Sequence, residues 1–445
     1  MDKRIKISKI ISAGFLLFAI IFGAGNLIYP PALGREAGEE WLPALMGFLT
    51  TDVGLTVIGI MAVALYNGHI ENITNRVSSY FTKIYISIIY LFIGPLFVMP
   101  RSSEVVYKTG IAPLLGQHVM SDSFALPLFS LGFFLIAWLM ALNSSKVMDY
   151  VGKYLTPILV MGLLILILMA IINPIGAVGR KSQVFGDYAF FEGFTKGYFT
   201  MDALGAFIPI SIIVHTFASY GVKSNKVMAV NIAKAGVVAG IVFTIVYSGL
   251  TYIGATSSNV LEVKDGAEIL AYGVHHFFGA VGIYVLMVIM FLACLTTVIG
   301  LITVGSQYFH HLFPFITYKK WTFISIVVSM VVSNAGLAQL EQIAGPILTV
   351  LYPVTIMLYG VALINKIYPL NRGAFIGSVF GAGFVAIIQL LQGYKIIFPF
   401  LTRLVEGLPL YKMGMPWVAP ALFLGIVGML ITTNQSNAAS KGDVE

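Results

Sequence analysis

A short stretch near the N-terminus, Phe22–Pro31, has the sequence FGAGNLIYPP and interrupts an otherwise apolar segment. Glycine lets the backbone leave helical geometry, and the Asn26 side chain can bond to main-chain groups that a break sets free. In lipid, such groups are costly unless something satisfies them. The stretch therefore predicts a helix that is broken at a binding site. The alternative is a face of small residues that packs against a neighbouring helix and ends at the proline pair.

The whole chain has the composition of an integral membrane protein. Of its 445 residues, 58% are hydrophobic and 10% are charged, whereas a soluble globular domain carries about 25% charged residues. Twelve spanning helices of about 20 residues each would use about 240 residues, so no separate soluble domain is expected. The net charge of +7 is spread over short loops and does not indicate nucleic-acid binding.

Apolar segments recur along the chain, and their lengths predict helices rather than the shorter strands of a membrane barrel. The expected spans lie near residues 9–31, 41–65, 81–100, 124–143, 153–173, 199–220, 229–256, 281–309, 322–334, 341–365, 372–392 and 416–433. We therefore expect an all-α integral membrane protein with about 12 transmembrane helices, a single transporter domain over residues 1–445 and the lipid bilayer as its surroundings. More of the 26 Lys and Arg residues fall in the loops on the side of the N-terminus, which predicts both termini in the cytoplasm.

The sixth expected span contains a second interruption, Thr200–Ser211, with the sequence TMDALGAFIPIS. Pro209 cannot donate a hydrogen bond to the carbonyl of Gly205, so a kink or a short unwound stretch is expected. An ordinary proline kink is the alternative. Interruptions at corresponding places in the two halves of a chain are typical of an inverted-repeat transporter.

Two adjacent threonines, Thr296 and Thr297, lie deep in the eighth expected span. Their hydroxyl oxygens could serve a bare cation as hard ligands. The alternative is that each hydroxyl bonds to a carbonyl of its own helix, as threonines in membrane helices commonly do.

Ionisable residues within the expected spans are few, and each is a candidate functional group. Asp52 lies near the centre of the second span and His215 in the inner half of the sixth, and either could carry a proton or take part in ion coupling. Asp202 lies nearer the outer end of the sixth span, where capping the helix is a sufficient role. Arg101 is expected to end the third span, where it could attract a substrate carboxylate or extend to the interface.

Several blocks of the sequence occur in the same order in one bacterial family. They are FGAGNLIYPP at 22–31, GPLFVMPR at 94–101, GYFTMDAL at 197–204, LACLTT at 292–297 and LYP at 351–353. In these blocks, which run through most of the chain, the sequence resembles the branched-chain amino acid:cation symporter family, the branched-chain amino acid transport system II carriers.

The resemblance implies a LeuT-like fold in which the first ten helices form a 5+5 inverted repeat with helices one and six broken. The two repeats would cover about 9–173 and 199–365, and two extra helices about 372–433. It also implies a symporter, and not an enzyme, that imports leucine, isoleucine and valine across the bacterial cell membrane on a sodium gradient.

By analogy with that fold, the sodium ion lies between the broken first helix and the eighth helix. The resemblance assigns it the backbone carbonyls of Ala19 and Phe22 and the hydroxyls of Thr296 and Thr297. The co-transported ion is then the only cofactor-like species, and no organic cofactor is expected.

The substrate is expected between the two breaks, because a zwitterion needs a partner for each of its charges. Helix N-termini favour a carboxylate, and carbonyls freed at a broken helix accept from an ammonium group. Phe207 is a candidate wall for an aliphatic side chain. The residues expected to bind the substrate are Gly23, Ala24, Gly25, Asn26, Gly205, Ala206 and Phe207.

The sequence departs from the family pattern at Asp52, at His215 and at Ile208–Ser211. These departures leave open a proton-coupled carrier of another small neutral amino acid or solute, which would use Asp52 or His215. A channel is disfavoured because no filter segment or gating-charge helix is visible. An enzyme is disfavoured because there is no metal-ligand cluster or nucleophile motif. No nucleic-acid partner and no obligate protein partner are expected.

Overall fold

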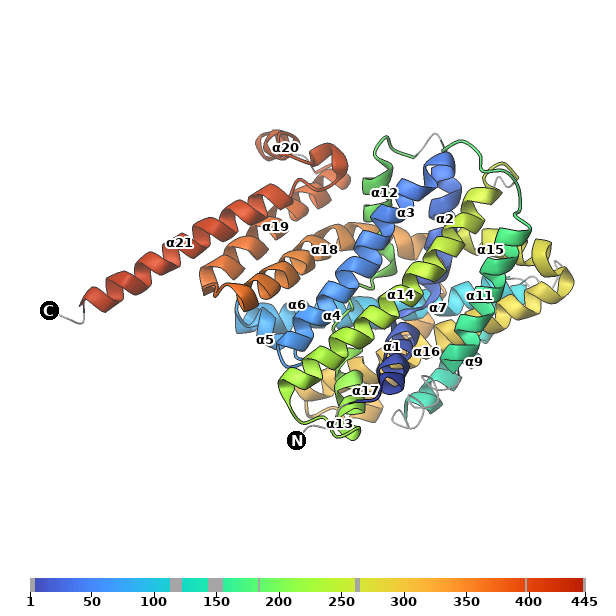
Figure 1. The fold of residues 1–445 in the computed structure, drawn as a ribbon, viewed down its shortest axis with the longest axis horizontal. Helices are drawn as coiled ribbons and strands as arrows, with labels where there is room; N and C mark the ends of the chain where they lie inside the picture. The colour runs from blue at the N-terminus through green and yellow to red at the C-terminus, as the bar shows by residue number, and fades with distance from the viewer. Residues whose placement is uncertain are drawn as a thin grey trace.

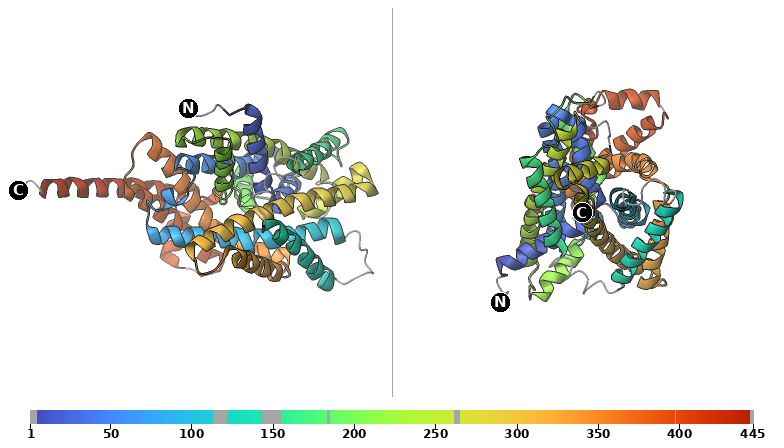
Figure 2. Two further views of the ribbon diagram at one scale, coloured as in Figure 1. Left: turned by 90° about the horizontal axis from the view of Figure 1, so that it is seen from below. Right: turned by 90° about the vertical axis from the view of Figure 1, so that its right-hand side faces the viewer.

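The computed structural model describes residues 5–112, 122–142, 155–182, 185–260, 265–396 and 398–442. Within these ranges every regular element is helical, and most helices pack into one bundle, as Figure 1 shows. The last helix, α21, extends beyond the bundle with its C-terminal end in Figures 1 and 2. Among the described residues, seven continuous helical stretches are long and apolar enough to cross a membrane, and shorter apolar helices accompany them. The all-helical membrane architecture is therefore confirmed, whereas the twelve spans and the two five-helix repeats remain predictions.

The α-helices are α1 (Ile7–Ile21), α2 (Ala24–Ala37), α3 (Trp41–Leu49), α4 (Leu55–Leu65), α5 (Glu71–Thr74), α6 (Ser79–Leu91), α7 (Val98–Val106), α9 (Asp122–Ala141), α11 (Thr156–Ile172), α12 (Ala189–Lys196), α13 (Ile210–Ser219), α14 (Asn225–Ser257), α15 (Gly266–Phe278), α16 (Ala280–Leu312), α17 (Tyr318–Ser333), α18 (Leu337–Ile367), α19 (Arg372–Gly393), α20 (Pro399–Glu406) and α21 (Val418–Gly442). Short 3₁₀ segments cover Gly38–Glu40, Gly197–Thr200 and Tyr411–Met413, and π-helical segments cover Thr50–Gly54, Phe92–Leu96 and Tyr107–Ile111. The last residue expected for the fourth span, 143, and the first two expected for the fifth, 153 and 154, lie outside the described residues.

The first expected span consists of two helices, α1 and α2, separated at Phe22 and Gly23. α2 does not end at the proline pair, as the sequence suggested, but continues through Pro30 and Pro31 to Ala37. Proline fits the φ angle of a helix, but it lacks the N–H donor and its ring crowds the carbonyl four residues earlier. The pair therefore removes two hydrogen bonds inside α2 without ending it.

The third expected span is longer than predicted and is bent in its middle. α6 leads into the π-helical segment Phe92–Leu96, where Gly94 has the non-helical angles φ −78° and ψ −113°, and α7 follows. Arg101 lies inside α7 and does not end the span, so that expectation was wrong. The chain can stay helical there because its polar residues from Arg101 to Glu104 are buried by other helices and do not face lipid.

The sixth expected span begins earlier than predicted, with α12 at Ala189, and is broken in its centre. After the 3₁₀ segment, the chain forms irregular turns from Met201 to Pro209 before α13 begins. We call Phe22–Gly23 the first break and Met201–Pro209 the second break. α15, between the seventh and eighth expected spans, was not predicted.

α14 crosses the front of the bundle in Figure 1 and packs closely against α2. A side chain at Gly34 would collide with the backbone of Thr251, and one at Gly254 with the backbone of Pro31. Small residues thus let the two helices approach closely, as they do in many membrane proteins. This contact brings Tyr247 of α14 beside the first break, with its ring 6.4 Å from that of Phe22.

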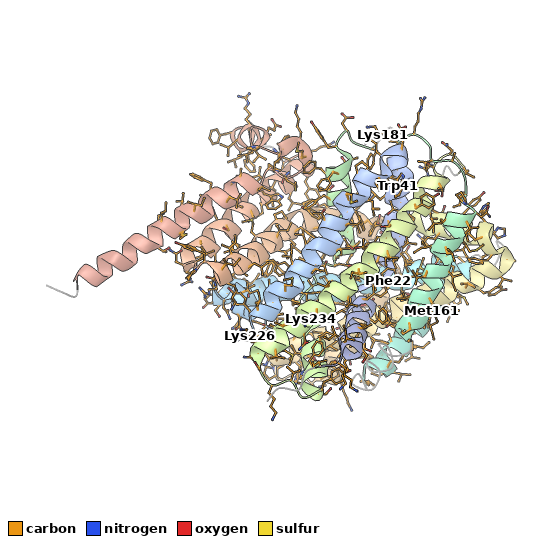
Figure 3. All side chains as sticks on the ribbon, viewed as in Figure 1. Phe22, Trp41, Met161, Lys181, Lys226 and Lys234 are labelled. Atoms are coloured by element: carbon orange, nitrogen blue, oxygen red, sulfur yellow. The ribbon has the colours of Figure 1, made fainter. Side chains whose placement is uncertain are left out.

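Lysine residues lie toward both ends of the bundle. Lys226 and Lys234 lie toward one end in Figure 3 and Lys181 lies at the other, with Phe22 between them. Lys181 Nζ lies 3.1 Å from Glu40 Oε1, and this hydrogen bond raises the pKa of Lys181. Phe22, and with it the first break, therefore lies well inside the bundle.

Candidate functional site

The first break is closed by local hydrogen bonds. The N–H of Phe22 donates to the carbonyl of Phe18 at 2.7 Å and ends α1. The N–H of Gly23 donates to Asn26 Oδ1 at 2.8 Å, so the asparagine caps the new helix from inside its first turn. The prediction that Asn26 satisfies a main-chain group of the break is confirmed by this contact.

The two threonines of α16 reach one carbonyl in the last turn of α1 and one in the first break. Thr296 Oγ1 lies 3.1 Å from the carbonyl oxygen of Ala19, and Thr297 Oγ1 lies 3.0 Å from that of Phe22. Thr296 is also 3.0 Å from the Ala293 carbonyl of its own helix, so the alternative of bonding within the helix holds in part. The structure thus brings together the four residues that the resemblance assigns to a cation. All four groups are neutral oxygens.

The second break is held by backbone turns and begins with a strained residue. Met201 has a φ of +68°, in the left-handed region that residues other than glycine rarely adopt. The N–H of Gly205 donates to the Met201 carbonyl at 2.9 Å, and the N–H of Ile208 donates to the Gly205 carbonyl at 2.9 Å. The Gly205 carbonyl that Pro209 cannot reach therefore has another donor.

A buried polar cluster joins the two breaks, and we call it the carboxylate cluster: Asp52, Asp202, Asn26, Thr200 and Tyr247. Asn26 Nδ2 lies 2.5 Å from both Asp202 Oδ2 and the Tyr247 hydroxyl. The Tyr247 hydroxyl donates to Asp202 Oδ2 at 3.2 Å, and the Thr200 hydroxyl bonds to Asp52. All five side chains are buried.

Asp52 reaches the cluster from a π-helical turn between α3 and α4. This turn, Thr50–Gly54, breaks the regular helix at the one charged residue of the span. π-Helical turns occur often at functional sites because they displace a residue from its regular position. The side chain of Asp52 interacts with those of Asp202 and Tyr247 as well as with Thr200.

A small cavity of ≈40 Å³ lies beside the cluster. Its lining comprises Ile20, Ile21, Ile93, Val98, Thr200, Met201, Asp202, Gly205, Ile208, Pro209, Thr297 and Leu301. Ligand pockets usually measure about 300–1,000 Å³, so this space must widen before it accepts an amino acid. Its walls are mostly branched aliphatic side chains, and Asp202 is the one charged residue of this lining.

Only some of the residues expected to bind substrate line the small cavity. Gly205 lines the cavity, whereas Phe207 is not part of its lining and packs against the ring of Tyr90 at 5.5 Å. Ala206 is buried against Gly59 of α4. Ile93, Val98, Ile208 and Leu301 form aliphatic walls of the small cavity.

A layer of polar contacts, which we call the Arg101 layer, lies on another side of the breaks. Arg101 Nη1 donates to the Phe199 carbonyl at 2.8 Å and to the Tyr29 hydroxyl at 3.0 Å, and that hydroxyl donates to Glu341 Oε1 at 2.8 Å. The guanidinium packs against Gly25, where a Cβ would lie 2.5 Å from Nη2. The layer therefore joins α2, α7, α18 and the chain just before the second break.

A second, larger cavity of ≈450 Å³ is lined in part by Tyr198 and Phe199. The next residues of the chain, Thr200 to Asp202, line the small cavity. The chain from Tyr198 to Asp202 thus passes from the lining of one cavity to that of the other, and Arg101 is bonded to it at the Phe199 carbonyl.

His215 is not brought together with the other candidates. It is exposed on α13 and is absent from the small cavity's lining and from the carboxylate cluster. Asp202, in contrast, was expected only to cap a helix and lies at the centre of the site. The signal that sequence reasoning passed over was that Asp202 falls inside the second interrupted stretch.

Comparisons with known proteins show which sequences this chain resembles. The sequence model of a family described as "Branched-chain amino acid transport protein" matches residues 6–435. The branched-chain amino acid permease BraB of Bacillus subtilis is 38% identical over 434 residues, which is 97% of each chain. The branched-chain amino acid permease BrnQ of Escherichia coli K12 is 35% identical over 440 residues, again 97% of each chain.

A solved structure shares the fold. It is a nucleobase-cation-symport-1 family transporter in a closed conformation with bromovinylhydantoin bound, and it superimposes with a TM-score of 0.57. The match covers 96% of this chain and 93% of the other at 16% sequence identity. At this identity the likeness concerns the fold alone.

Proposed function

Because the chain belongs to the family of branched-chain amino acid transport proteins, we propose that it is a secondary symporter that imports leucine, isoleucine and valine on a sodium gradient. The relatives reported above are permeases, so the chain is a transport protein and not an enzyme. The setting proposed for it is the bacterial cell membrane, with both termini in the cytoplasm.

The contact between α16 and the first break is the observation that carries the sodium proposal. Thr296 and Thr297 lie within 3.1 Å of the Ala19 and Phe22 carbonyls, and the four oxygens are neutral. Unwound backbone carbonyls of broken helices are typical sodium ligands in such transporters. A sodium ion here would replace the two hydrogen bonds and hold the first break in one conformation.

The substrate would bind between the breaks, in a widened form of the small cavity. The first turn of α2, Ala24 to Asn26, offers N–H groups and a partial positive charge to the carboxylate, beside Gly23, whose own N–H already donates to Asn26. Main-chain carbonyls from Gly205 to Phe207 remain candidates for the ammonium group. The aliphatic lining of the cavity suits a branched side chain. Because one methylene changes binding by only about 1–3 kcal/mol, transport of all three branched-chain amino acids is expected.

Coupling would arise because both ligands act on the first break. Sodium would order the carbonyls of Ala19 and Phe22, and the substrate carboxylate would meet the N-terminus of α2 just beyond them. Each ligand then raises the affinity of the other by the same factor, typically worth about 1–3 kcal/mol. In the transport cycle, the Arg101 layer would open toward the larger cavity to admit substrate and then close again.

Reconstitution in liposomes tests this function. Uptake of labelled leucine, isoleucine, valine and alanine is measured with an inward sodium gradient and with sodium replaced by potassium. We expect uptake of the three branched-chain amino acids, little uptake of alanine, and dependence on sodium. Uptake that is equal in potassium would refute sodium coupling.

The second candidate is a proton-coupled carrier, and the burial of Asp52 in the carboxylate cluster favours it. Because His215 is exposed on α13, Asp52 is the stronger of the two proton candidates. Uptake in potassium buffer at several pH values separates the two candidates. A pH gradient drives transport without sodium only in the second.

A further inference from the structure

Two carboxylates, Asp52 and Asp202, interact with each other inside the bundle. They are 1% and 5% exposed, respectively. Neither forms an ion pair with a basic side chain in the part of the chain that the structure describes. The nearby cation, Arg101, directs Nη1 at the Phe199 carbonyl and the Tyr29 hydroxyl. Two adjacent negative charges cannot both persist in such a site. A proton bound to one carboxylate removes one of these charges, and the other charge needs a positive partner.

Of the two carboxylates, Asp202 is the one that faces the small cavity. Asp202 lines the small cavity, together with Thr200 and Thr297, whereas Asp52 is not part of this lining. Asp52 lies behind Thr200, to which it is hydrogen-bonded, and its Oδ2 has no hydrogen-bond partner among the described residues. A cationic ligand that enters the cavity therefore meets the carboxylate of Asp202 first.

The surroundings of Asp202 indicate which cation suits it. Its Oδ2 already accepts hydrogen bonds from Asn26 and Tyr247 at 2.5 and 3.2 Å, so the groups that contact this oxygen within the cluster are hydrogen-bond donors. Besides Thr200 and Thr297, the rest of the cavity lining is mostly apolar and includes the branched aliphatic side chains of Ile93 and Leu301. A bare ion gains nothing from these apolar walls, whereas an ammonium group attached to a branched aliphatic chain fits both the carboxylate and the walls.

We propose that Asp202 binds the α-ammonium group of the transported amino acid, an inference that rests on the proposed function. Main-chain carbonyls of the second break would then accept hydrogen bonds from the ammonium group together with Asp202, and would not bind it alone. This arrangement makes recognition of the amine strict. A substrate analogue that lacks the ammonium group would leave the Asp202 charge buried without a partner, and its own carboxylate would be repelled.

Binding of analogues to the purified full-length protein tests the inference. Leucine is compared with 4-methylpentanoate, which lacks the amine, and with 3-methylbutylamine, which lacks the carboxylate. For the wild-type protein we expect leucine to bind about 10,000-fold more tightly than 4-methylpentanoate. In Asp202→Asn, which keeps the shape but removes the charge, we expect this ratio to fall by about 100-fold. Binding of 3-methylbutylamine should be lost, while the affinity for 4-methylpentanoate should rise because the repulsion by the Asp202 charge is gone.

Two further variants separate charge from folding. Asp202→Glu keeps the carboxylate and should keep most of the discrimination, which covers the case in which the asparagine variant does not fold. Glu104→Gln is the matched control, because Glu104 is another buried carboxylate, on α7, and its ion pair is with Lys108. It should leave the ratio within twofold of the wild-type value.

Other outcomes would overturn the inference. If Asp202→Asn keeps the preference for leucine over 4-methylpentanoate but no longer binds sodium without substrate, Asp202 belongs to a cation site. If the preference is kept and only the pH dependence of uptake changes, Asp202 carries a proton. Failure of the wild-type protein to take up any branched-chain amino acid would refute the proposed function. Binding of 3-methylbutylamine to the wild type and to Asp202→Asn would still decide whether Asp202 holds an amine.

Discussion

The two breaks of the bundle have similar roles in the fold but different chemistry. The first break is two residues long, and its Phe22 carbonyl and the nearby Ala19 carbonyl of α1 meet the neutral hydroxyls of Thr297 and Thr296. The second break runs from Met201 to Pro209, begins with a left-handed residue and carries the buried carboxylate of Asp202. Neutral oxygens suit a small cation, which can replace the hydrogen bonds between them. A buried charge suits a ligand that carries the opposite charge. The difference separates the proposed ion site from the proposed amine site.

The side chain of one residue of α2 forms hydrogen bonds with both breaks. Asn26 accepts from the N–H of Gly23 through Oδ1 and donates to Asp202 and Tyr247 through Nδ2. Its amide orientation is fixed because its oxygen and its nitrogen each have a partner of the right kind. Asn26 therefore makes the geometry of the first break depend on that of the second.

The largest effect is expected from removing this link with Asn26→Ala. The N–H of Gly23 loses its acceptor and the carboxylate of Asp202 loses a donor, each at a cost of about 1–3 kcal/mol. We expect initial leucine uptake to fall by about 100-fold or more, because both costs act on the transport-competent state. Uptake into proteoliposomes, corrected for the amount of folded protein, measures the effect.

Asn231→Ala is the matched control for this prediction. Asn231 is also buried, but its side chain bonds to the Val227 carbonyl of its own helix. It should change uptake by less than about threefold, as expected for one hydrogen bond within a helix. Equal losses in the two variants would mean that Asn26 does not connect the breaks.

A smaller effect is expected from Arg101→Lys, which alters the contacts of the Arg101 layer with the chain beside each break. The planar guanidinium donates to two acceptors, and lysine keeps the charge but not this geometry. Loss of one hydrogen bond to a charged donor costs about 1.5–3 kcal/mol. We expect uptake to fall by about 30-fold. Arg76→Lys, at an exposed arginine, should have no comparable effect.

Sequence reasoning found the first break and not the chemistry of the second, and the reason is local. Gly23, Asn26 and the threonine pair reveal themselves by residue type, since glycine and an amide in an apolar span have few other uses. The partners within the carboxylate cluster cannot be found this way, because they are far apart in the sequence. Asn26 and Asp202 are 176 positions apart, and Thr200 and Asp52 are 148 positions apart.

The remaining differences concern backbone geometry that residue types do not encode. No local signal marks the π-helical turn that moves Asp52 into the cluster. The direction in which Phe207 points depends on the turns of the second break, and these place it against Tyr90 outside the cavity lining. Prolines at 30 and 31 suggested an end to the helix, but packing against α14 stabilises α2 beyond them.

The proposed ion site predicts a moderate and selective effect. In the double variant Thr296→Ala and Thr297→Ala, the carbonyls of Ala19 and Phe22 lose both hydroxyl partners. We expect the sodium concentration for half-maximal uptake to rise by about tenfold, which corresponds to about 1.4 kcal/mol. Thr303→Ala, on the same helix, is the control because Thr303 bonds to the Ile299 carbonyl of its own helix. Unchanged sodium activation in the double variant would contradict the site assignment.

The smallest effect distinguishes the two breaks most directly. A Cβ on Gly23 would lie 3.2 Å from Thr297 Oγ1 and 3.3 Å from Thr297 Cγ2, so Gly23→Ala must push the hydroxyl aside by a few tenths of an ångström. The backbone at Gly23 is extended, with φ −125° and ψ −158°, and accepts alanine without strain. We therefore expect sodium affinity to fall by about threefold, or about 0.7 kcal/mol, while the preference for leucine over 4-methylpentanoate is unchanged. Gly305→Ala on α16, whose Cβ would meet no atom closer than 3.8 Å, should alter neither quantity. A change in amine recognition without a change in sodium affinity would reverse the roles proposed for the two breaks.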